Sequence, residues 1–263
     1  PVLCLLSESL GAEKPGYTSP DHRLTPHINK VFQEARGRIF IATYNQSTYN
    51  IEEIIDLAKK LNKKILFYND EVKDFFTRFN SINALMIPNA NYVSTDNLLR
   101  TREQDLIILM MGHGENLYRD IELLAGNAQE DKRFVLGPSD TFVVAAPPVP
   151  SIEILATDAI DQLYRTGAKV IHLTKKHIAN MHAQEEDLKM LLSMLKPKYY
   201  IPIKGEYRHL MANAKLAVGM GVNLSHQNIF LLDNGMIVRF EDRGAKLLGS
   251  DLDRIPTSDL LID

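Results

Sequence analysis

Short apolar runs alternate along this chain with longer segments in which apolar residues recur at every third or fourth position. The apolar runs, each followed by polar residues or by glycine or proline, predict strands at residues 2–6, 38–44, 64–68, 105–110, 141–145, 169–173 and 199–203. The segments of helical period predict amphipathic helices at residues 51–61, 152–165, 185–195 and 210–218. The alternation is typical of an α/β fold with a parallel-rich sheet flanked by helices, whose sites lie at the carboxyl ends of the strands.

The carboxyl-terminal part of the chain carries a hairpin signal. Asp233-Asn234-Gly235 separates the apolar residues 229–232 from residues 236–240, and Asn-Gly suits the tight turn between antiparallel strands. Residues 260–263 predict the start of one further strand.

Composition narrows the class of protein. The 263 residues are 45% hydrophobic and 24% charged, which is enough for one large globular domain or two smaller ones. The net charge of -3 argues against a broad basic face, so any RNA contact must be local. Cys4 is the only cysteine, which excludes a disulfide framework and favours a reducing, cytoplasmic setting. Because the chain opens inside an apolar run without a methionine, we expect that further sequence precedes Pro1.

Two candidate functional side chains stand at the ends of predicted elements. Lys204 follows the strand at 199–203 and precedes Gly205, so it can reach a cleft at the strand end; alternatively it is merely solvated and Gly205 only permits a turn. His182 precedes the helix at 185–195, which Asn180 could cap. There His182 could transfer a proton or bind phosphate near free N–H groups, or it could only form local hydrogen bonds.

Two loops after predicted strands also carry polar residues. In Ser7-Glu8-Ser9 the carboxylate could orient a histidine or a metal-bound water, or the serines could simply satisfy the following turn. In Gly112-His113-Gly114-Glu115 the glycines would let backbone N–H groups approach a phosphate, although chain reversal explains them equally well. The spacing is neither a P-loop nor a dinucleotide fingerprint.

A metal-dependent hydrolase needs several ligands to activate water, and this chain lacks the usual pattern for them. It contains no His-x-His-x-Asp-His motif, and its eight histidines lack the paired spacing of a metal site. We therefore expect that the chain alone cannot assemble a catalytic metal site.

Several separate stretches, in the same order along the chain, together resemble the ribonuclease J family. They are residues 5–9 (LLSES), 13–18 (EKPGYT), 162–168 (QLYRTGA), 196–202 (KPKYYIP), 205–208 (GEYR) and 232–235 (LDNG). The resemblance implies a β-CASP domain inserted into a metallo-β-lactamase domain. Residues 1–18 would be the tail of the first metallo-β-lactamase segment, 19–180 the β-CASP domain and 181–263 the returning segment, so that the metallo-β-lactamase domain is incomplete in this chain.

The resemblance also implies activity and site residues. The resemblance implies a family of zinc- or manganese-dependent 5′-to-3′ exoribonucleases and endoribonucleases that process and degrade RNA. Glu8 falls on the acidic residue of the first β-CASP motif and His182 on the histidine of the second, and both are catalytic candidates. Lys204, the third, stands where active members have a metal-binding histidine. A lysine offers only donors and a positive charge, so it repels a metal ion.

The positions that the resemblance assigns to RNA also depart from the family pattern. Where the family has Ala-Ser-Asn-Ile-His-Arg, residues 45–50 of this chain read Asn-Gln-Ser-Thr-Tyr-Asn. The family's Gly-Ser-Gln-Gly-Glu-Pro loop is reduced to Gly-His-Gly-Glu-Asn at residues 112–116. The family's Ser-Gly-His is replaced by Asn-Met-His at residues 180–182, and its Pro-Ile-Pro-Gly by Pro-Val-Pro-Ser at residues 148–151. The RNA- or phosphate-binding candidates at these positions are Gln46, Ser47, Tyr49, Asn50, Gly112, His113, Gly114, Glu115 and Asn180.

These departures predict a subunit with degenerate metal and phosphate sites, similar to the weakly active second paralogue of the family. Its expected role is that of an RNA-binding or architectural partner without a metal of its own, whereas active members hold zinc or manganese. Expected partners are RNA, further copies of the chain and the active paralogue, in the cytoplasm. Two alternatives remain: a competent metal-dependent ribonuclease with a substituted ligand set, or an unrelated nucleotide-binding α/β module that uses residues 112–115 as its phosphate loop.

Overall fold

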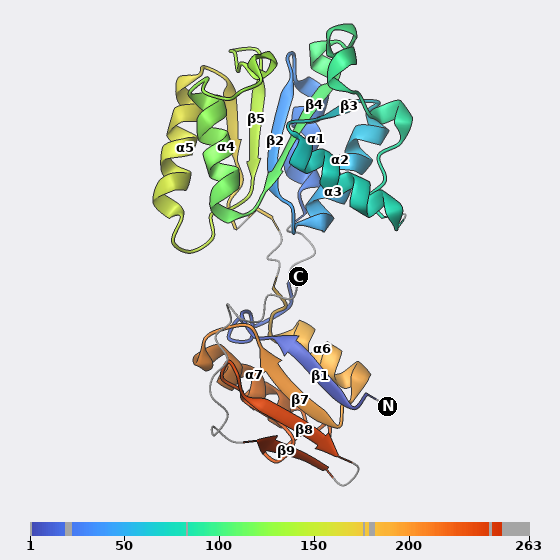
Figure 1. The fold of residues 1–263 in the computed structure, drawn as a ribbon, viewed down its shortest axis with the longest axis vertical. Coiled ribbons are helices and arrows are strands. Elements are labelled where there is room, and N and C mark those ends of the chain that lie inside the picture. Colours follow the sequence, from blue (N-terminus) through green and yellow to red (C-terminus); the bar gives the residue numbers. More distant parts are fainter. Residues whose placement is uncertain are drawn as a thin grey trace. The chain divides into compact units, whose positions relative to one another are not determined.

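The fold consists of two compact units, shown as a ribbon in Figure 1. The computed structural model describes residues 2–18, 23–82, 84–175, 177–178, 182–241 and 244–248. The central unit comprises Pro20–Ala179, and the terminal unit combines Pro1–Ser19 with Asn180–Asp263. None of the described helices is long and apolar enough to cross a membrane.

The central unit is built on a parallel sheet with the strand order β3-β4-β2-β5-β6. Every residue of the inner strands β2 and β4 is buried, as expected for parallel strands that are covered on both faces. The strands are β2 (Ile39–Tyr44), β3 (Lys64–Phe67), β4 (Leu106–Gly112), β5 (Thr141–Ala145) and β6 (Lys169–His172).

Helices cover both faces of this sheet (Figure 1). Alternate residues of each strand point to opposite faces, so Ile41 packs in one apolar cluster and Phe40 in the other. The first cluster joins the sheet to α1 (Thr25–Glu34), α2 (Thr48–Lys60) and α3 (Asp70–Ser81). The second joins it to α4 (Gly114–Ala125) and α5 (Glu153–Arg165). Short 3-10 turns lie at Asn89–Asn91, Thr95–Arg100, Glu103–Asp105 and Lys132–Phe134.

The terminal unit pairs two segments from opposite ends of the chain. Strand β1 (Cys4–Glu8) is parallel to β7 (Tyr199–Ile203), with Glu8 opposite Ile203. The helices α6 (Glu185–Leu195) and α7 (Tyr207–Gly219) follow the returning chain, and β8 (Ile237–Glu241) pairs with β9 (Gly244–Leu248) as an antiparallel hairpin. Leu192, Tyr200, Ala217 and Leu224 form its buried core.

The predicted α/β class with a parallel-rich sheet is confirmed, and each of the seven predicted strands and four predicted helices has a counterpart. The predicted hairpin was wrong: β8 begins after the Asn-Gly turn, and Ile229 forms only an isolated bridge with Tyr200. The turn itself is present, since the Met236 N–H donates to the Asp233 carbonyl. A hairpin turn of this type needs positive φ at both central residues, and here only Gly235 has one, at 85°. The strand predicted at 260–263 lies outside the described residues.

Candidate functional site

Glu8, His182 and Lys204 meet in the terminal unit. Glu8 ends β1 and Lys204 directly follows β7, so the parallel pairing of these strands brings the two residues together. The Lys204 Nζ atom lies 3.3 Å from Glu8 Oε2, and the His182 Nδ1 atom lies 3.1 Å from Glu8 Oε2 and 3.2 Å from Oε1. The Ala183 N–H also donates to Glu8 Oε1 at 3.3 Å. The Glu8 carboxylate is therefore the common partner of both candidate side chains.

The backbone at Lys204 has an unusual conformation. Its φ is 56°, in the left-handed region, and Gly205 follows with a φ of 145°. The Lys204 carbonyl accepts a hydrogen bond from the Ser9 N–H at 3.1 Å, which ties the chain after β7 to the chain after β1. The side chain is 59% exposed, so its ion pair with Glu8 is expected to stabilise the fold by no more than about 1 kcal/mol.

The contact between His182 and Glu8 selects a state of the imidazole. When Nδ1 carries the proton, it donates to the carboxylate, and Nε2 then holds the lone pair. This arrangement can position a base or a ligand atom. By itself, it offers one imidazole nitrogen and one carboxylate.

A buried hydrogen-bond network supports Glu8 from below the site. The Tyr200 phenol donates to Asn213 Oδ1 at 2.8 Å, and the Ser7 hydroxyl lies 2.6 Å from the same phenol oxygen. Asn213 in turn donates to the Glu8 carbonyl and to Ser9 Oγ, both at 3.1 Å. Burial raises the pKa of Tyr200, and the hydrogen bonds with Ser7 and Asn213 oppose this rise. Tyr200 and Asn213 were not predicted as site residues. The available signal was an asparagine on the apolar face of the helix predicted at 210–218.

The amino terminus of α6 is already occupied by the protein's own acceptors. The Glu185 and Glu186 N–H groups donate to the carbonyls of Lys14 and Gly16. Gln184 and Asp187 form a reciprocal capping box, so Gln184 is the cap; Asn180 lies outside the described residues. The expected anion-binding N–H groups beside His182 are therefore already paired.

Asp187 fixes the same helix end to Thr18. Its carboxylate accepts from the Thr18 N–H and hydroxyl, each at 2.8 Å, and from the Gln184 N–H at 3.0 Å. Burial raises the pKa of Asp187, but these hydrogen bonds outweigh it and hold the pKa below its usual value. The segment that carries His182 is thereby anchored.

A second group of candidates lies in the central unit, at the carboxyl ends of β2 and β4. These strands are neighbours, yet β2 leads to α2 on one face of the sheet and β4 leads to α4 on the other. The carboxyl ends of two such strands form a switch point of the sheet, and α/β proteins commonly bind ligands there. Here Asn45 Nδ2 lies 2.7 Å from His113 Nε2, and Gln46 Nε2 lies 3.2 Å from His113 Nδ1. A neutral imidazole accepts at only one nitrogen, so one of the two contacts must involve an amide oxygen as acceptor.

The other RNA candidates of the central unit differ in exposure. Tyr49 is 54% exposed, and its hydroxyl accepts a hydrogen bond from Arg23 at 2.7 Å. Ser47 and Asn50 are buried, so the candidates with exposed side chains here are Gln46, Tyr49, His113 and Glu115.

The glycine stretch is a strand end that runs directly into a helix. Gly112 is the last residue of β4, and a Cβ atom there would lie 3.2 Å from Leu117. Gly114 begins α4 with a φ of 37°, and Glu115 is held in an ion pair with Arg119. Gly112 therefore permits close packing of strand and helix, and Gly114 permits the positive φ at the start of α4, which accounts for both glycines without a ligand.

The donors that the structure describes around Glu8 do not by themselves suit a metal ion. Among the residues that the structure describes, no three His, Cys, Asp or Glu side chains converge as a metal site would require. Glu8 and His182 provide two donors, and the third member of the cluster is the Lys204 ammonium, which has no lone pair at neutral pH.

Comparison with known families matches two parts of the chain. Residues 36–163 match the model described as "Ribonuclease J, beta-CASP domain", and residues 176–227 match the "Zn-dependent metallo-hydrolase RNA specificity domain".

Curated relatives extend this similarity to the whole chain. Ribonuclease J2 of Bacillus subtilis is 28% identical over 262 residues, which are 100% of this chain and 46% of the relative. Ribonuclease J 2 of Staphylococcus aureus is 28% identical and that of Staphylococcus epidermidis 27% identical, each over 264 residues with the same coverage. The chain spans about half the length of the curated relatives it matches.

Proposed function

The chain belongs to the ribonuclease J family, and we propose that it acts there as an RNA-binding or architectural subunit of RNA processing and decay. The observation that carries this proposal is the contact of Lys204 Nζ with Glu8 Oε2 at 3.3 Å. A positive side chain stands beside the acidic residue of the site, at the position where active members of the family have a metal-binding histidine.

The change from imidazole to ammonium acts on a metal ion in two ways. It removes a lone pair that would bind the ion, and it adds a unit charge that repels it. For a divalent ion about 4 Å away, that repulsion is about 2 kcal/mol even in bulk water, or roughly thirtyfold in affinity. The exposed lysine can swing outward to relieve the repulsion, but the missing ligand is not restored. Zinc or manganese chemistry is therefore assigned to the active members of the family.

We propose that the two units are the domains that the family resemblance implies. We assign the central unit as the β-CASP domain, because it encloses the match at residues 36–163. We assign the terminal unit, with residues 1–18 and 181–263, as metallo-β-lactamase segments.

RNA contact is proposed for exposed side chains at the carboxyl ends of β2 and β4 in the central sheet. Gln46, Tyr49 and His113 offer amide, aromatic and imidazole groups, which suit bases and single phosphates rather than a long polyanion. A subunit that lacks a metal site needs a catalytic partner to cleave RNA, so we propose a hetero-oligomer with the active paralogue in the cytoplasm, alongside self-association.

The test compares the wild type with Lys204→His and Lys204→Met in the full-length protein. The assay is manganese-dependent digestion of 5′-monophosphorylated RNA, with RNA affinity measured by fluorescence anisotropy and bound metal by elemental analysis. We expect RNA binding in all three proteins and little gain of activity in Lys204→His, because Gln46, Tyr49 and Asn50 also depart from the family pattern. The Lys204→Met variant removes the charge without adding a ligand and serves as the control.

The alternative, a competent metal-dependent ribonuclease, predicts different results. It requires stoichiometric zinc or manganese in the wild-type protein and RNA digestion that depends on Glu8 and His182. A gain of about a hundredfold in the rate of RNA digestion from Lys204→His alone is equivalent to ~2.7 kcal/mol of transition-state stabilisation. It would show that only the metal ligand was missing and that the RNA- and phosphate-binding positions are intact.

A further inference from the structure

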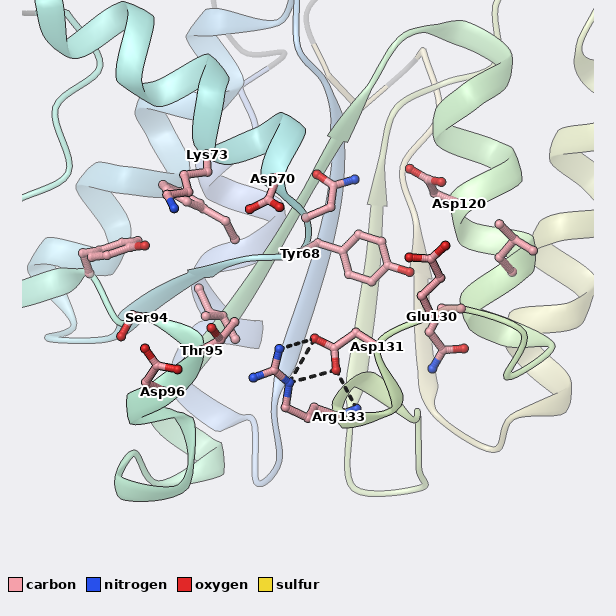
Figure 2. Close-up of a pocket in the computed structure, with 16 residues that line it drawn as sticks. Tyr68, Asp70, Lys73, Ser94, Thr95, Asp96, Asp120, Glu130, Asp131 and Arg133 are labelled. Atoms are coloured by element: carbon pink, nitrogen blue, oxygen red, sulfur yellow. Dashed lines mark hydrogen bonds and ion pairs between the residues drawn. The ribbon is translucent and has the colours of Figure 1, made fainter.

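The central unit contains a cavity at the open edge of its sheet that none of the candidate RNA residues lines. The cavity has a volume of about 680 Å³ and lies beside β3, between α3, α4 and the chain around Glu130 (Figure 2). This volume is within the range of sites for small molecules, which is about 300–1,000 Å³.

The lining of the cavity is acidic. Arg133 is held by Asp131, since its Nε atom donates to Asp131 Oδ1 at 2.8 Å and to Oδ2 at 3.0 Å. Figure 2 shows Asp120 and Glu130 on one wall and Lys73 on the opposite wall. The charged lining residues are the acidic Asp70, Asp96, Asp120, Glu130 and Asp131 and the basic Lys73 and Arg133. The excess of carboxylates repels phosphate groups, so RNA and nucleotides are poor occupants.

Gln129 provides an independent indication that a donor belongs in the cavity. It lines the cavity, it is only 5% exposed, and its Oε1 atom has no hydrogen-bond partner among the residues that the structure describes. Its amide nitrogen makes only a long contact of 3.5 Å with Asn127 Oδ1. Buried acceptors are normally paired, so this oxygen calls for an N–H or O–H donor from a ligand.

Asp120 lies on the same wall as Glu130 (Figure 2), and no donor among the described residues forms a hydrogen bond with it. Burial, with a smaller contribution from the Glu71 charge, raises the pKa of Asp120 above its usual value. A cation in the cavity would reverse both effects, because it would replace lost hydration and balance the charge.

The aromatic side chains of the cavity favour an organic cation. Tyr68 lies in the middle of the cavity with its hydroxyl end toward Glu130 (Figure 2). Burial raises the pKa of Tyr68 to about 12, so the phenol is neutral and its ring face can attract a cation. In the described part of the chain no three acidic or histidine side chains converge closely enough to hold a metal ion, which argues against an inorganic cation.

We propose that this cavity binds an aliphatic polyamine. Such a molecule carries several N–H donors and positive charges on a flexible apolar chain. Its ammonium groups would pair with Asp120, Glu130 and the free oxygen of Gln129, while its methylene groups would lie against the ring of Tyr68.

Isothermal titration calorimetry with spermidine tests the proposal on the purified protein, at low salt and at physiological salt (~0.15 M). The site variant is Asp120→Asn with Glu130→Gln. The matched control, Glu153→Gln with Asp158→Asn, removes the same charge from exposed positions on α5. Gln129→Leu is a third variant that removes the free acceptor without changing the charge. Circular dichroism checks that each variant is folded.

The expected result is saturable binding of about one equivalent of spermidine to the wild type. The site variant and Gln129→Leu should each weaken it, the former by roughly tenfold or more, while the control stays within about twofold. Absence of saturable binding, or equal weakening in the site and control variants, would overturn the proposal. Displacement of spermidine by an equal concentration of Mg²⁺ would also overturn it, since the site would then be a general cation site.

Discussion

Replacing Tyr200 by phenylalanine removes one oxygen atom from the network that supports Glu8. In the wild type this oxygen bonds to Ser7 at 2.6 Å and to Asn213 at 2.8 Å. Tyr200 and Asn213 are 0% exposed and Ser7 is 8% exposed, so water cannot easily replace the lost partner. The variant leaves two buried polar groups unpaired at about 1–3 kcal/mol each, and partial rearrangement lowers the sum. We expect a loss of about 2–4 kcal/mol of unfolding free energy.

Urea unfolding followed by circular dichroism measures this loss. Tyr199→Phe is the matched control, because Tyr199 is a buried tyrosine of the same strand whose ring packs on Phe230 and Phe240. Its hydroxyl makes no hydrogen bond within the described part of the chain, so its loss should change stability by less than about 0.5 kcal/mol.

A double-mutant cycle sharpens the test. Adding Ser7→Ala to Tyr200→Phe removes one of the two unpaired groups, so the double variant should be less destabilised than the sum of the single variants. Additive effects, or a loss below about 0.5 kcal/mol for Tyr200→Phe, would refute the view that this network is closed to water.

Three further changes test other parts of the structure. Asp140 is buried and accepts from Arg38 Nε at 3.0 Å and Nη2 at 2.6 Å. Asp140→Ala should therefore cost about 3–5 kcal/mol by urea unfolding, because it removes the carboxylate that balances the charge of the largely buried guanidinium. The folded-state pKa of Asp120 is raised above its usual value of 3.8. The unfolding free energy is therefore highest below pH 3.8 and falls as the pH rises through the folded-state pKa. Asp120→Asn should therefore raise the melting temperature at pH 7 and leave it unchanged below pH 3.8, and a lowered melting temperature at pH 7 would contradict this. A Cβ on Gly11 would lie 2.0 Å from the Ala183 carbonyl oxygen, so Gly11→Ala should lower the free energy of unfolding in urea by about 1–3 kcal/mol. An unchanged free energy would show that the backbone at Ala183 can move away at no cost.

The strands were predictable because each is an apolar run bounded by polar or flexible residues, a signal that does not depend on tertiary contacts. Helix α3 was missed although Val72, Phe75, Phe76 and Phe79 recur at the three- and four-residue spacing of an amphipathic helix. Helix α4 was missed because its first residue is Gly114, and a glycine pair at a strand end indicates a loop as readily as a helix start.

The site was predictable only in part. The motifs singled out Glu8 and His182, but these residues are 174 positions apart, and no local pattern gives their contact. The pairing of Lys204 with Glu8 depends on the parallel register of β1 and β7, which periodicity does not specify. The cavity beside β3 is formed by side chains from several elements, so no short motif could have indicated it.

The composition of the terminal unit from both ends of the chain bears on how the protein is made. Its network joins Ser7 to Tyr200 across 193 residues, whereas the central unit is continuous in sequence. The rings of His27 and His177 lie 5.2 Å apart, so the chain enters and leaves the central unit at neighbouring points. Bringing β1 and β7 together closes a loop of 193 residues, which costs about 5 kcal/mol of chain entropy in an unfolded chain. If the central unit folds first, most of this loop is already closed.

At a synthesis rate of about 5–20 residues per second, β1 waits roughly 10–40 seconds on the ribosome before β7 emerges. During that interval β1 lacks β7, the strand with which it pairs in this unit. Among the described strands, β1 is therefore the one that chaperones have most time to bind before its pairing partner is made.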